Sequence, residues 1–339
     1  MLQQTQVKTV IPFWERWLRE LPTIAAAANA SADKLHKLWE GLGYYTRVRN
    51  LQMAAQVIIQ RHGGKFPERF ADVLELPGIG RYTAGAICSI AFNQPTPILD
   101  GNVIRVLTRI FGIADNPKEK ITNERLWKLA EQLVVQASRS TDHEAKSRTR
   151  TKDENDGCSA LNQSLMELGA LVCTPRNAQC LLCPVRKLCV AFRENRVDAL
   201  PNLGRREPAT ARRFAAFVLE HDGKFLVRQR PTGAVNAHLW EFPNVELGEL
   251  VPGSPTAVAT AAAAVLGFAP HDLSSLVTVK HSITRYRITL EAFRVNPGRA
   301  RFPKSGAVWK TPAQMRPLAF TSAHRRILRA AVARLAAPR

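Results

Sequence analysis

Leu76-Pro77-Gly78-Ile79-Gly80-Arg81-Tyr82-Thr83-Ala84-Gly85-Ala86-Ile87 is the stretch around which the rest of the chain is organised. Pro77 fixes one backbone angle, while Gly78 and Gly80 permit positive φ and let another molecule approach the main chain closely. Helical patterns at residues 68–75 and 81–92 flank it, which predicts a helix-hairpin-helix. The two glycine amides and the start of the second helix would then form a cradle that binds a nucleic-acid phosphate without reading base sequence. An ordinary helix-turn-helix corner is the alternative.

The composition favours a polyanionic partner. The chain has 339 residues, with 48 Lys plus Arg against 28 Asp plus Glu, which gives a formal net charge of +20. This surplus exceeds what solubility requires and is typical of nucleic-acid-binding proteins, although a generally basic proteome would also produce it. No apolar run is long enough to cross a bilayer, and Met1 is followed at once by polar residues rather than by a signal peptide. We therefore expect a cytoplasmic protein that does not contact a membrane.

Hydrophobic periodicity divides the chain into a helical part and an α+β part. Helical spacing continues to about residue 193 and is interrupted by a polar, charged stretch at 138–157, which we predict to be a disordered insertion. Residues 194–212 are rich in Pro, Arg and Asn and are typical of a linker. From residue 213 onward apolar and polar residues alternate, and Asp222-Gly223 predicts a β-hairpin turn. Other expected helices lie at 31–40, 45–62, 123–137, 160–172, 256–266 and 319–336, and expected strands at 214–220, 225–230, 276–280 and 283–295.

Four cysteines predict a metal centre in the loop 173–189. Cys173, Cys180, Cys183 and Cys189 follow the spacing C-x6-C-x2-C-x5-C, and thiolates this close in a reducing compartment are more typical of a metal site than of disulfides. Zinc would take four thiolates equally well, but zinc ribbons usually present two CxxC pairs and this loop has one. The spacing favours a [4Fe-4S] cluster and leaves zinc as the alternative.

Several motifs, taken in order, resemble the helix-hairpin-helix DNA glycosylase superfamily and, within it, the MutY-type adenine DNA glycosylases. They are Met1-Leu-Gln-Gln-Thr-Gln-Val, Trp39-Glu-Gly-Leu-Gly-Tyr-Tyr, the hairpin 76–87, Leu99-Asp-Gly-Asn-Val-Ile-Arg-Val, Asn162-Gln-Ser-Leu-Met-Glu-Leu-Gly-Ala, the cysteine loop and Leu239-Trp-Glu-Phe-Pro. The resemblance spans nearly the whole chain except 138–157. It implies a multidomain protein: an all-α glycosylase core at 1–193 with a [4Fe-4S] loop, the linker 194–212, and an α+β Nudix-like domain at 213–339 that recognises 8-oxoguanine.

The resemblance implies base-excision repair of double-stranded DNA in which adenine is mispaired with 8-oxoguanine or guanine. Such enzymes flip the target nucleotide out of the duplex and hydrolyse its N-glycosidic bond. Asp100 matches the carboxylate that stabilises the sugar cation, although its place at a helix entrance is also that of a plain N-cap. Asn102 and Gln163 match further active-site positions. Tyr82 stands where the endonuclease III-like lyases carry a Schiff-base lysine, so the resemblance implies a glycosylase without lyase activity.

The resemblance also assigns residues that contact DNA. Those near the strand that carries 8-oxoguanine are Gln4, Thr5, Leu42 and Tyr44, and Leu2 and Gln3 are further substrate- or DNA-binding positions. An aromatic side chain on a tight turn can fill the gap that a flipped base leaves, and core packing is the alternative for Tyr44. In the Nudix-like domain, residues 248–267 carry only Glu249, so metal-dependent diphosphate hydrolysis has too few ligands. Where many members have Phe-Ser-His, this chain has Ile283-Thr284-Arg285, in which Thr284 keeps a hydroxyl and Arg285 can contact phosphate.

One element of the family pattern lies outside the printed sequence. The family's general-acid glutamate precedes the Met-Leu-Gln-Gln-Thr-Gln-Val stretch by two residues, and here that methionine is Met1. We therefore expect an N-terminally truncated chain that binds DNA but releases little adenine. A non-catalytic lesion-binding protein and an endonuclease III-like lyase are the alternatives. We further expect the protein to be a monomer, to be bacterial and to associate with the nucleoid.

Overall fold

The computed structural model describes residues 1–3, 5–145, 156–205, 207–248, 255–283, 285–296, 298 and 306–335. Contacts between residues group the chain into two compact units. Met1–Gln56 and Glu207–Arg339 form one, called here the terminal unit, and Val57–Arg206 form the other, called here the central unit. The predicted division into 1–193, 194–212 and 213–339 stays a prediction.

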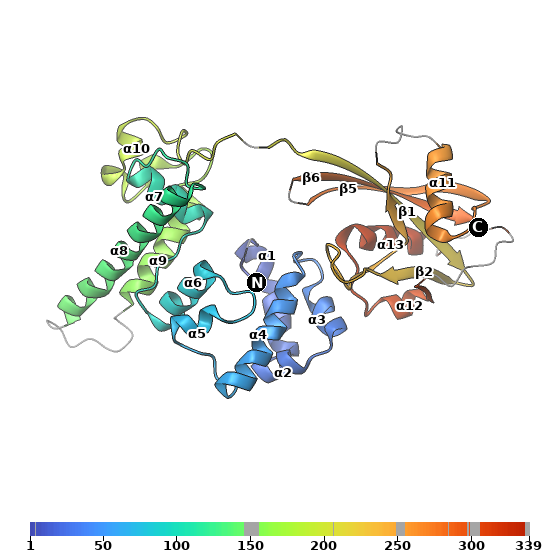
Figure 1. Cartoon of the computed structure of the whole chain (residues 1–339), viewed down its shortest axis with the longest axis horizontal. Helices are drawn as coiled ribbons and strands as arrows, with labels where there is room; N and C mark the ends of the chain where they lie inside the picture. Colours follow the sequence, from blue (N-terminus) through green and yellow to red (C-terminus); the bar gives the residue numbers. More distant parts are fainter. Residues whose placement is uncertain are drawn as a thin grey trace. The chain divides into compact units, whose positions relative to one another are not determined.

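The terminal unit begins with four helices (Figure 1): α1 Val7–Glu20, α2 Ile24–Asn29, α3 Ala32–Trp39 and α4 Thr46–His62, the last of which continues into the central unit. Thr23 and Ser31 cap α2 and α3, because each hydroxyl oxygen accepts a hydrogen bond from the backbone amide three residues further along the chain. Trp17 and Trp39 pack edge to face at 5.9 Å in the core between these helices. The helices predicted at 31–40 and 45–62 are confirmed.

The rest of the terminal unit is a mixed sheet. Its core order is β3-β2-β1-β6-β5, with β4 beside β1 and β7 beside β2, and β1 and β6 are parallel. Asp222 and Gly223 have φ of 51° and 70°, which confirms the predicted hairpin turn between β1 and β2. The strands are β1 Thr210–His221, β2 Lys224–Gln229, β3 Trp240–Glu241, β4 Asn244–Glu246, β5 Asp272–Ile283, β6 Tyr286–Asn296 and β7 Ala307–Lys310.

Successive side chains of β1 point to opposite faces of the sheet, and a helix packs on each face, which gives three layers. Ala215 and Phe217 pack with α11 (Pro255–Leu266), and Ala216 and Val218 pack with α13 (Ser322–Leu335). The two helices therefore cover opposite faces of the sheet, and the short α12 (Pro312–Met315) leads into α13 (Figure 1). This arrangement confirms the predicted α+β Nudix-like part.

Two sets of strand limits predicted in this part were wrong. Strand β1 begins at Thr210 rather than at residue 214, because it pairs with β6 from Tyr286 onward. We predicted strands at 276–280 and 283–295, whereas β5 runs to Ile283 and pairs there with Tyr286. Long strands form here because ladder hydrogen bonds continue through polar residues that show no apolar alternation. Thr284 lies outside the described residues.

The buried carboxylate of Glu241 lies beside three basic side chains, of which His324 is also buried. Arg228 Nε donates to its carboxylate at 2.9 Å, Arg230 donates through Nη1, and His324 Nε2 lies 4.0 Å away. His324 Nδ1 accepts the Phe242 amide at 3.1 Å. Burial, with smaller effects from its charged neighbours, lowers the pKa of His324 to about 4.

We expect this histidine to make the protein sensitive to acid. The unfolded chain binds a proton on His324 near pH 6.5, whereas the folded chain holds the side chain neutral to about pH 4. The contribution of the neutral side chain to the free energy of unfolding is therefore fully present above pH 6.5. It falls by up to about 3 kcal/mol as the pH drops to 4. Denaturant unfolding between pH 7 and 4 measures the loss. His324→Asn, which keeps an acceptor for the Phe242 amide, should remove this part of the slope, and an unchanged slope would contradict the assignment.

The central unit is helical, as predicted. Its core includes Ile98, Val103, Val106, Leu107 and Leu126, which are fully buried. Helices α8 and α9 lie side by side (Figure 1). Its helices are α5 Phe70–Leu74, α6 Arg81–Phe92, α7 Gly101–Ile110, α8 Lys120–Ala145, α9 Gly157–Glu167, the π-helical turn Leu168–Val172, the 3-10 turns Cys180–Leu182 and Arg186–Leu188, and α10 Val190–Arg193.

The disordered insertion predicted at 138–157 was wrong at both ends. Helix α8 continues to Ala145 and α9 begins at Gly157, so only residues 146–155 of that stretch lie outside the described residues. A helix extends through polar residues because its backbone hydrogen bonds are local and, once nucleated, need no apolar contact at each turn. None of the described helices is both long enough and apolar enough to span a membrane.

Candidate functional site

The glycine hairpin connects α5 and α6 as predicted. The Ile79 amide donates to Leu76 O at 3.1 Å, and Gly78 has φ of 78°, a value that favours glycine. Gly80 is the N-cap of α6 with φ of −96°, so it does not use the positive φ that we expected of it. A Cβ at Gly80 would meet nothing within 4 Å. The space beside the start of α6 is therefore open to a ligand.

Asp100 is the N-cap of α7. Its Oδ1 accepts the amides of Asn102 and Val103 at 3.0 and 2.8 Å, and its Oδ2 accepts Asn102 Nδ2 at 3.3 Å. Three donors thus fix the carboxylate, and the half-buried residue still reaches the surface. Because Oδ2 accepts only one long hydrogen bond, it is the oxygen with the greater remaining capacity for a cationic partner.

Arg105 holds the residues beside Asp100 in place from within the core. Its guanidinium donates to Asn102 Oδ1 at 2.8 Å, to Gly169 O at 2.6 Å and to Cys173 O at 2.7 Å. A Cβ at Gly169 would lie 2.8 Å from Asn102 Cβ, so only glycine permits this close approach. Burial lowers the pKa of Arg105, which is 8% exposed. The cysteine loop is therefore connected to the start of α7 through one buried cation.

Tyr82 lies near Asp100, whereas Gln163 bonds within its own helix. Tyr82 Oη lies 3.4 Å from Met166 Sδ, and burial, followed by the charge of Asp100, raises the pKa of the tyrosine. Gln163 is exposed on α9, where its Nε2 donates to Ser159 Oγ at 3.0 Å. Asn102 and Tyr82 therefore both lie near Asp100, and their roles in the reaction stay a prediction.

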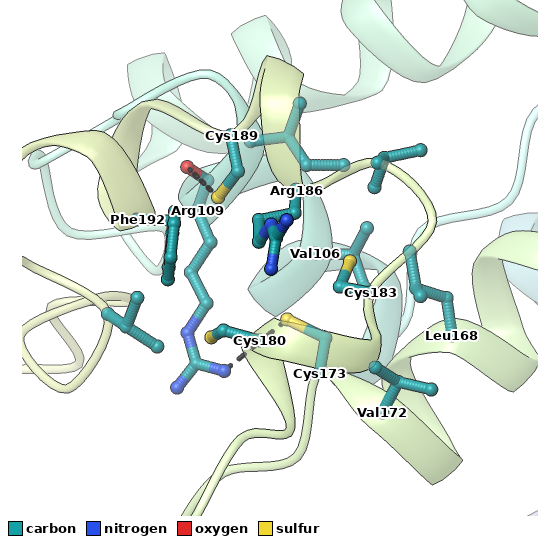
Figure 2. A pocket seen from close by; sticks show the side chains of 13 residues that line it. Val106, Arg109, Leu168, Val172, Cys173, Cys180, Cys183, Arg186, Cys189 and Phe192 are labelled. Carbon is teal, nitrogen blue, oxygen red and sulfur yellow. Dashed lines mark hydrogen bonds between the residues drawn. The ribbon is translucent and has the colours of Figure 1, made fainter.

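All four predicted ligand cysteines line one cavity. Figure 2 shows Cys173, Cys180, Cys183 and Cys189 around it, with Arg109 reaching across. The space, including its open mouth, is about 390 Å³. Arg109 Nη1 donates to Cys173 Sγ at 3.3 Å, and Cys189 Sγ lies 3.4 Å from Arg109 O.

Burial and neighbouring charges act on the thiols of this cavity. Within the described residues, no three His, Cys, Asp or Glu side chains are close enough together to hold a single metal ion. Burial, then the charges of the neighbouring cysteines, raises the pKa of Cys180 and Cys183. Four thiolates would therefore repel one another here unless a positively charged group lay between them.

Arg47 contacts several of the residues in the terminal unit that we predicted to bind DNA. Its guanidinium donates to Gln3 O, to Thr5 Oγ1 at 3.3 Å and to Leu42 O at 3.0 Å. It also lies 5.6 Å from the centre of the Tyr44 ring. The segment that begins at Met1 and the turn 41–44 are therefore held together by one side chain. Gln4 lies outside the described residues.

The turn 41–44 exposes one predicted contact and buries another. Tyr44 has φ of 47° and is 53% exposed, which argues against the core-packing alternative. Leu42 is 6% exposed and packs in the core, so the structure gives it a packing role, and its contact with DNA stays a prediction. Leu2 is exposed.

The turn between β5 and β6 carries an aromatic residue that we had not singled out. Arg285 lies over the Tyr286 ring at 5.3 Å and Arg212 lies 5.0 Å from it. A hydrogen bond from Arg285 lowers the pKa of Tyr286. The chain therefore presents an aromatic ring between two cations at this loop.

Sequence reasoning missed Arg47, Arg105 and Arg109. Arg105 and Arg109 are buried although they are charged, and each bonds backbone oxygens far away in the sequence. The available signal was a pair of arginines on the apolar helix that follows Asp100. A charged residue in such a place requires buried partners.

Comparisons with known proteins match most of the chain. The family described as HhH-GPD superfamily base excision DNA repair protein matches residues 1–132, and the NUDIX domain family matches residues 214–330. The adenine DNA glycosylase of Rattus norvegicus is 35% identical over 382 residues, covering 97% of this chain and 69% of that protein. Those of Mus musculus and Homo sapiens are each 38% identical over 292 residues. This chain covers 53% of the mouse and 50% of the human protein.

Solved structures are similar to parts of the chain. A thermostable thymine-DNA glycosylase has a TM-score of 0.47 at 25% identity, covering 57% of this chain and 80% of that one. An endonuclease III–DNA complex has a TM-score of 0.44 at 20% identity with the same coverage.

Proposed function

Because the chain belongs to the adenine DNA glycosylase family, we propose that it recognises adenine paired with 8-oxoguanine or guanine and cleaves the N-glycosidic bond of that adenine. The observation that carries the proposal is the Asp100 carboxylate, fixed by three donors at the start of α7. A fixed carboxylate stabilises positive charge without reorganising during the reaction.

Cleavage leaves positive charge on the sugar. The adenine must leave the base stack, a general acid protonates it, and the bonding electrons depart with the base. Asp100 Oδ2 would face the resulting oxocarbenium-like sugar until water adds to C1′ and gives up a proton to solvent. Asn102, oriented by Arg105, keeps the carboxylate in place. Tyr82 lines the nucleotide pocket and has no amine with which to form a Schiff base.

We assign a [4Fe-4S] cluster to the cysteine cavity. The four cysteines line one cavity. Their C-x6-C-x2-C-x5-C spacing has one CxxC pair, whereas zinc ribbons usually have two. Four thiolates would each bind one iron of a [4Fe-4S] cluster. When bound, the cluster would neutralise the thiolates and fix the loop 173–189, whose Arg176, Arg186 and Lys187 would meet DNA phosphates.

The remaining surfaces complete the proposed contact with DNA. The amides of Gly78 and Gly80 would bind one phosphate at the start of α6. Tyr44 would enter the gap left by the flipped base, and Gln3, Gln4 and Thr5 would line that strand. Thr284 and Arg285 would contact the strand that carries 8-oxoguanine. Gln163 would contact DNA from α9.

Lesion-selective binding tests the proposal without requiring the chemical step. We expect duplex with adenine opposite 8-oxoguanine to bind at least about tenfold more tightly than the same duplex with adenine opposite thymine, measured by fluorescence anisotropy at fixed salt. Equal affinity for the two duplexes would contradict it. Borohydride treatment distinguishes the glycosylase from the lyase alternative. A lyase would be trapped covalently on DNA through its lysine adduct, and a glycosylase without that lysine would not.

A further inference from the structure

Glu40 is a buried carboxylate at the end of α3, immediately before the turn that exposes Tyr44. Its side chain is 5% exposed. Lys37 Nζ donates to Oε2 at 2.8 Å, Arg325 Nη1 donates to Oε2 at 2.9 Å, and the Phe320 amide donates to Oε1 at 3.0 Å. Both carboxylate oxygens are therefore hydrogen-bonded, and two cations neutralise the charge.

Two of these three donors come from the Nudix-like part of the terminal unit, about 280 residues further along the chain. Lys37 Nζ also donates to Leu318 O at 3.0 Å, and Arg49 donates to Ala237 O at 3.3 Å. Leu239 and Ala319 pack in the same core as the residues of α1, α3 and α4. Glu40 thus lies at the polar centre of a continuous joint between the first helices and the Nudix-like part.

Immediately after Glu40 the chain forms a turn whose backbone is restricted. Gly41 has φ of 110°, and its amide donates to Tyr45 Oη at 3.3 Å. Trp39 Nε1 donates to Gly43 O at 3.0 Å. Because these hydrogen bonds restrict the backbone of the turn, the position of Glu40 limits where the exposed Tyr44, four residues further along, can lie.

We propose that Glu40 is a positioning residue that fixes the Tyr44 turn to the Nudix-like part, so that both act on the lesion as one rigid surface. The inference rests on the proposed function, in which Tyr44 and the β5–β6 turn face the same damaged duplex. Removing the carboxylate would leave the buried Phe320 amide without its acceptor, which is costly, and would leave Arg325 without its ion-pair partner. The joint would loosen while the rest of each part kept its own core.

A double-mutant cycle in the full chain tests the joint. The variants are Glu40→Gln, Arg325→Met and the two combined, and Arg326→Met, an exposed neighbour on α13, is the control. In denaturant unfolding without DNA, we expect the double variant to lose less stability than the sum of the single variants, because both remove one interaction. Additive losses would overturn the joint.

Binding to DNA tests the positioning role. Glu40→Gln should lower the ratio of affinities for lesion and undamaged duplex about tenfold while leaving affinity for undamaged duplex unchanged. Tyr44→Ala should lower the same ratio, and Arg326→Met should not. A coupled joint with an unchanged ratio in Glu40→Gln would overturn the positioning role, as would a Tyr44→Ala variant with full selectivity. Absence of selectivity in the unsubstituted chain would instead contradict the proposed function.

Discussion

Replacing Asp100 by asparagine lowers the single-turnover rate of adenine release by about 10³-fold, the size expected when one preorganised stabilising charge is removed. Asparagine is an equally good N-cap, so it still accepts the amides of Asn102 and Val103 and keeps α7 intact. The substitution therefore removes the negative charge but not the fold. Affinity for the lesion duplex should stay within a few fold of that of the unsubstituted chain.

The assay separates the two roles of Asp100. It compares the single-turnover rates of adenine release from the same lesion duplex for each variant. Asp115→Asn, an exposed carboxylate of the same unit, is the matched control and should leave the rate unchanged. Asp100→Ala should lose stability as well as rate. Equal rates for Asp100→Asn and the unsubstituted chain would make Asp100 a helix cap only.

Replacing Cys183 by serine removes the visible absorbance and the bound iron of the purified protein and weakens binding to DNA. The loop 173–189 has two short 3-10 turns and exposes Leu181, Leu182 and Leu188, so few apolar contacts hold it. Metal ligation supplies folding free energy in such loops. Without the cluster, the carbonyl of Cys173 would hold Arg105 less firmly.

The control is Cys88→Ser in the same unit. Cys88 is buried against α5 and lies outside the cavity, so its substitution should lower the thermal midpoint but keep the iron. Four irons and four sulfides per chain are expected by metal and sulfide analysis. One tightly bound zinc and no iron would contradict the cluster, and unchanged DNA affinity in Cys183→Ser would contradict the role of the loop in binding.

Local patterns predicted the elements well. The PGIG stretch predicted the hairpin between α5 and α6, and the Asp222-Gly223 pair predicted the turn between β1 and β2. Both signals come from residues that restrict or free their own backbone, so no distant partner is needed. The limits of β5, β6 and α8 were missed because pairing and helix propagation carry regular structure through polar residues.

The sequence by itself determined the helical and α+β parts, the carboxylate of Asp100 at a helix start and the loop that carries the four cysteines, because each depends on residue type and local spacing. Only the tertiary structure decided which charges are buried and what they hold. Glu40 meets Arg325, and Arg105 meets the carbonyls of Gly169 and Cys173, across long separations in the chain. A buried charge is stable only with its partners, and folding, rather than spacing along the chain, brings those partners together.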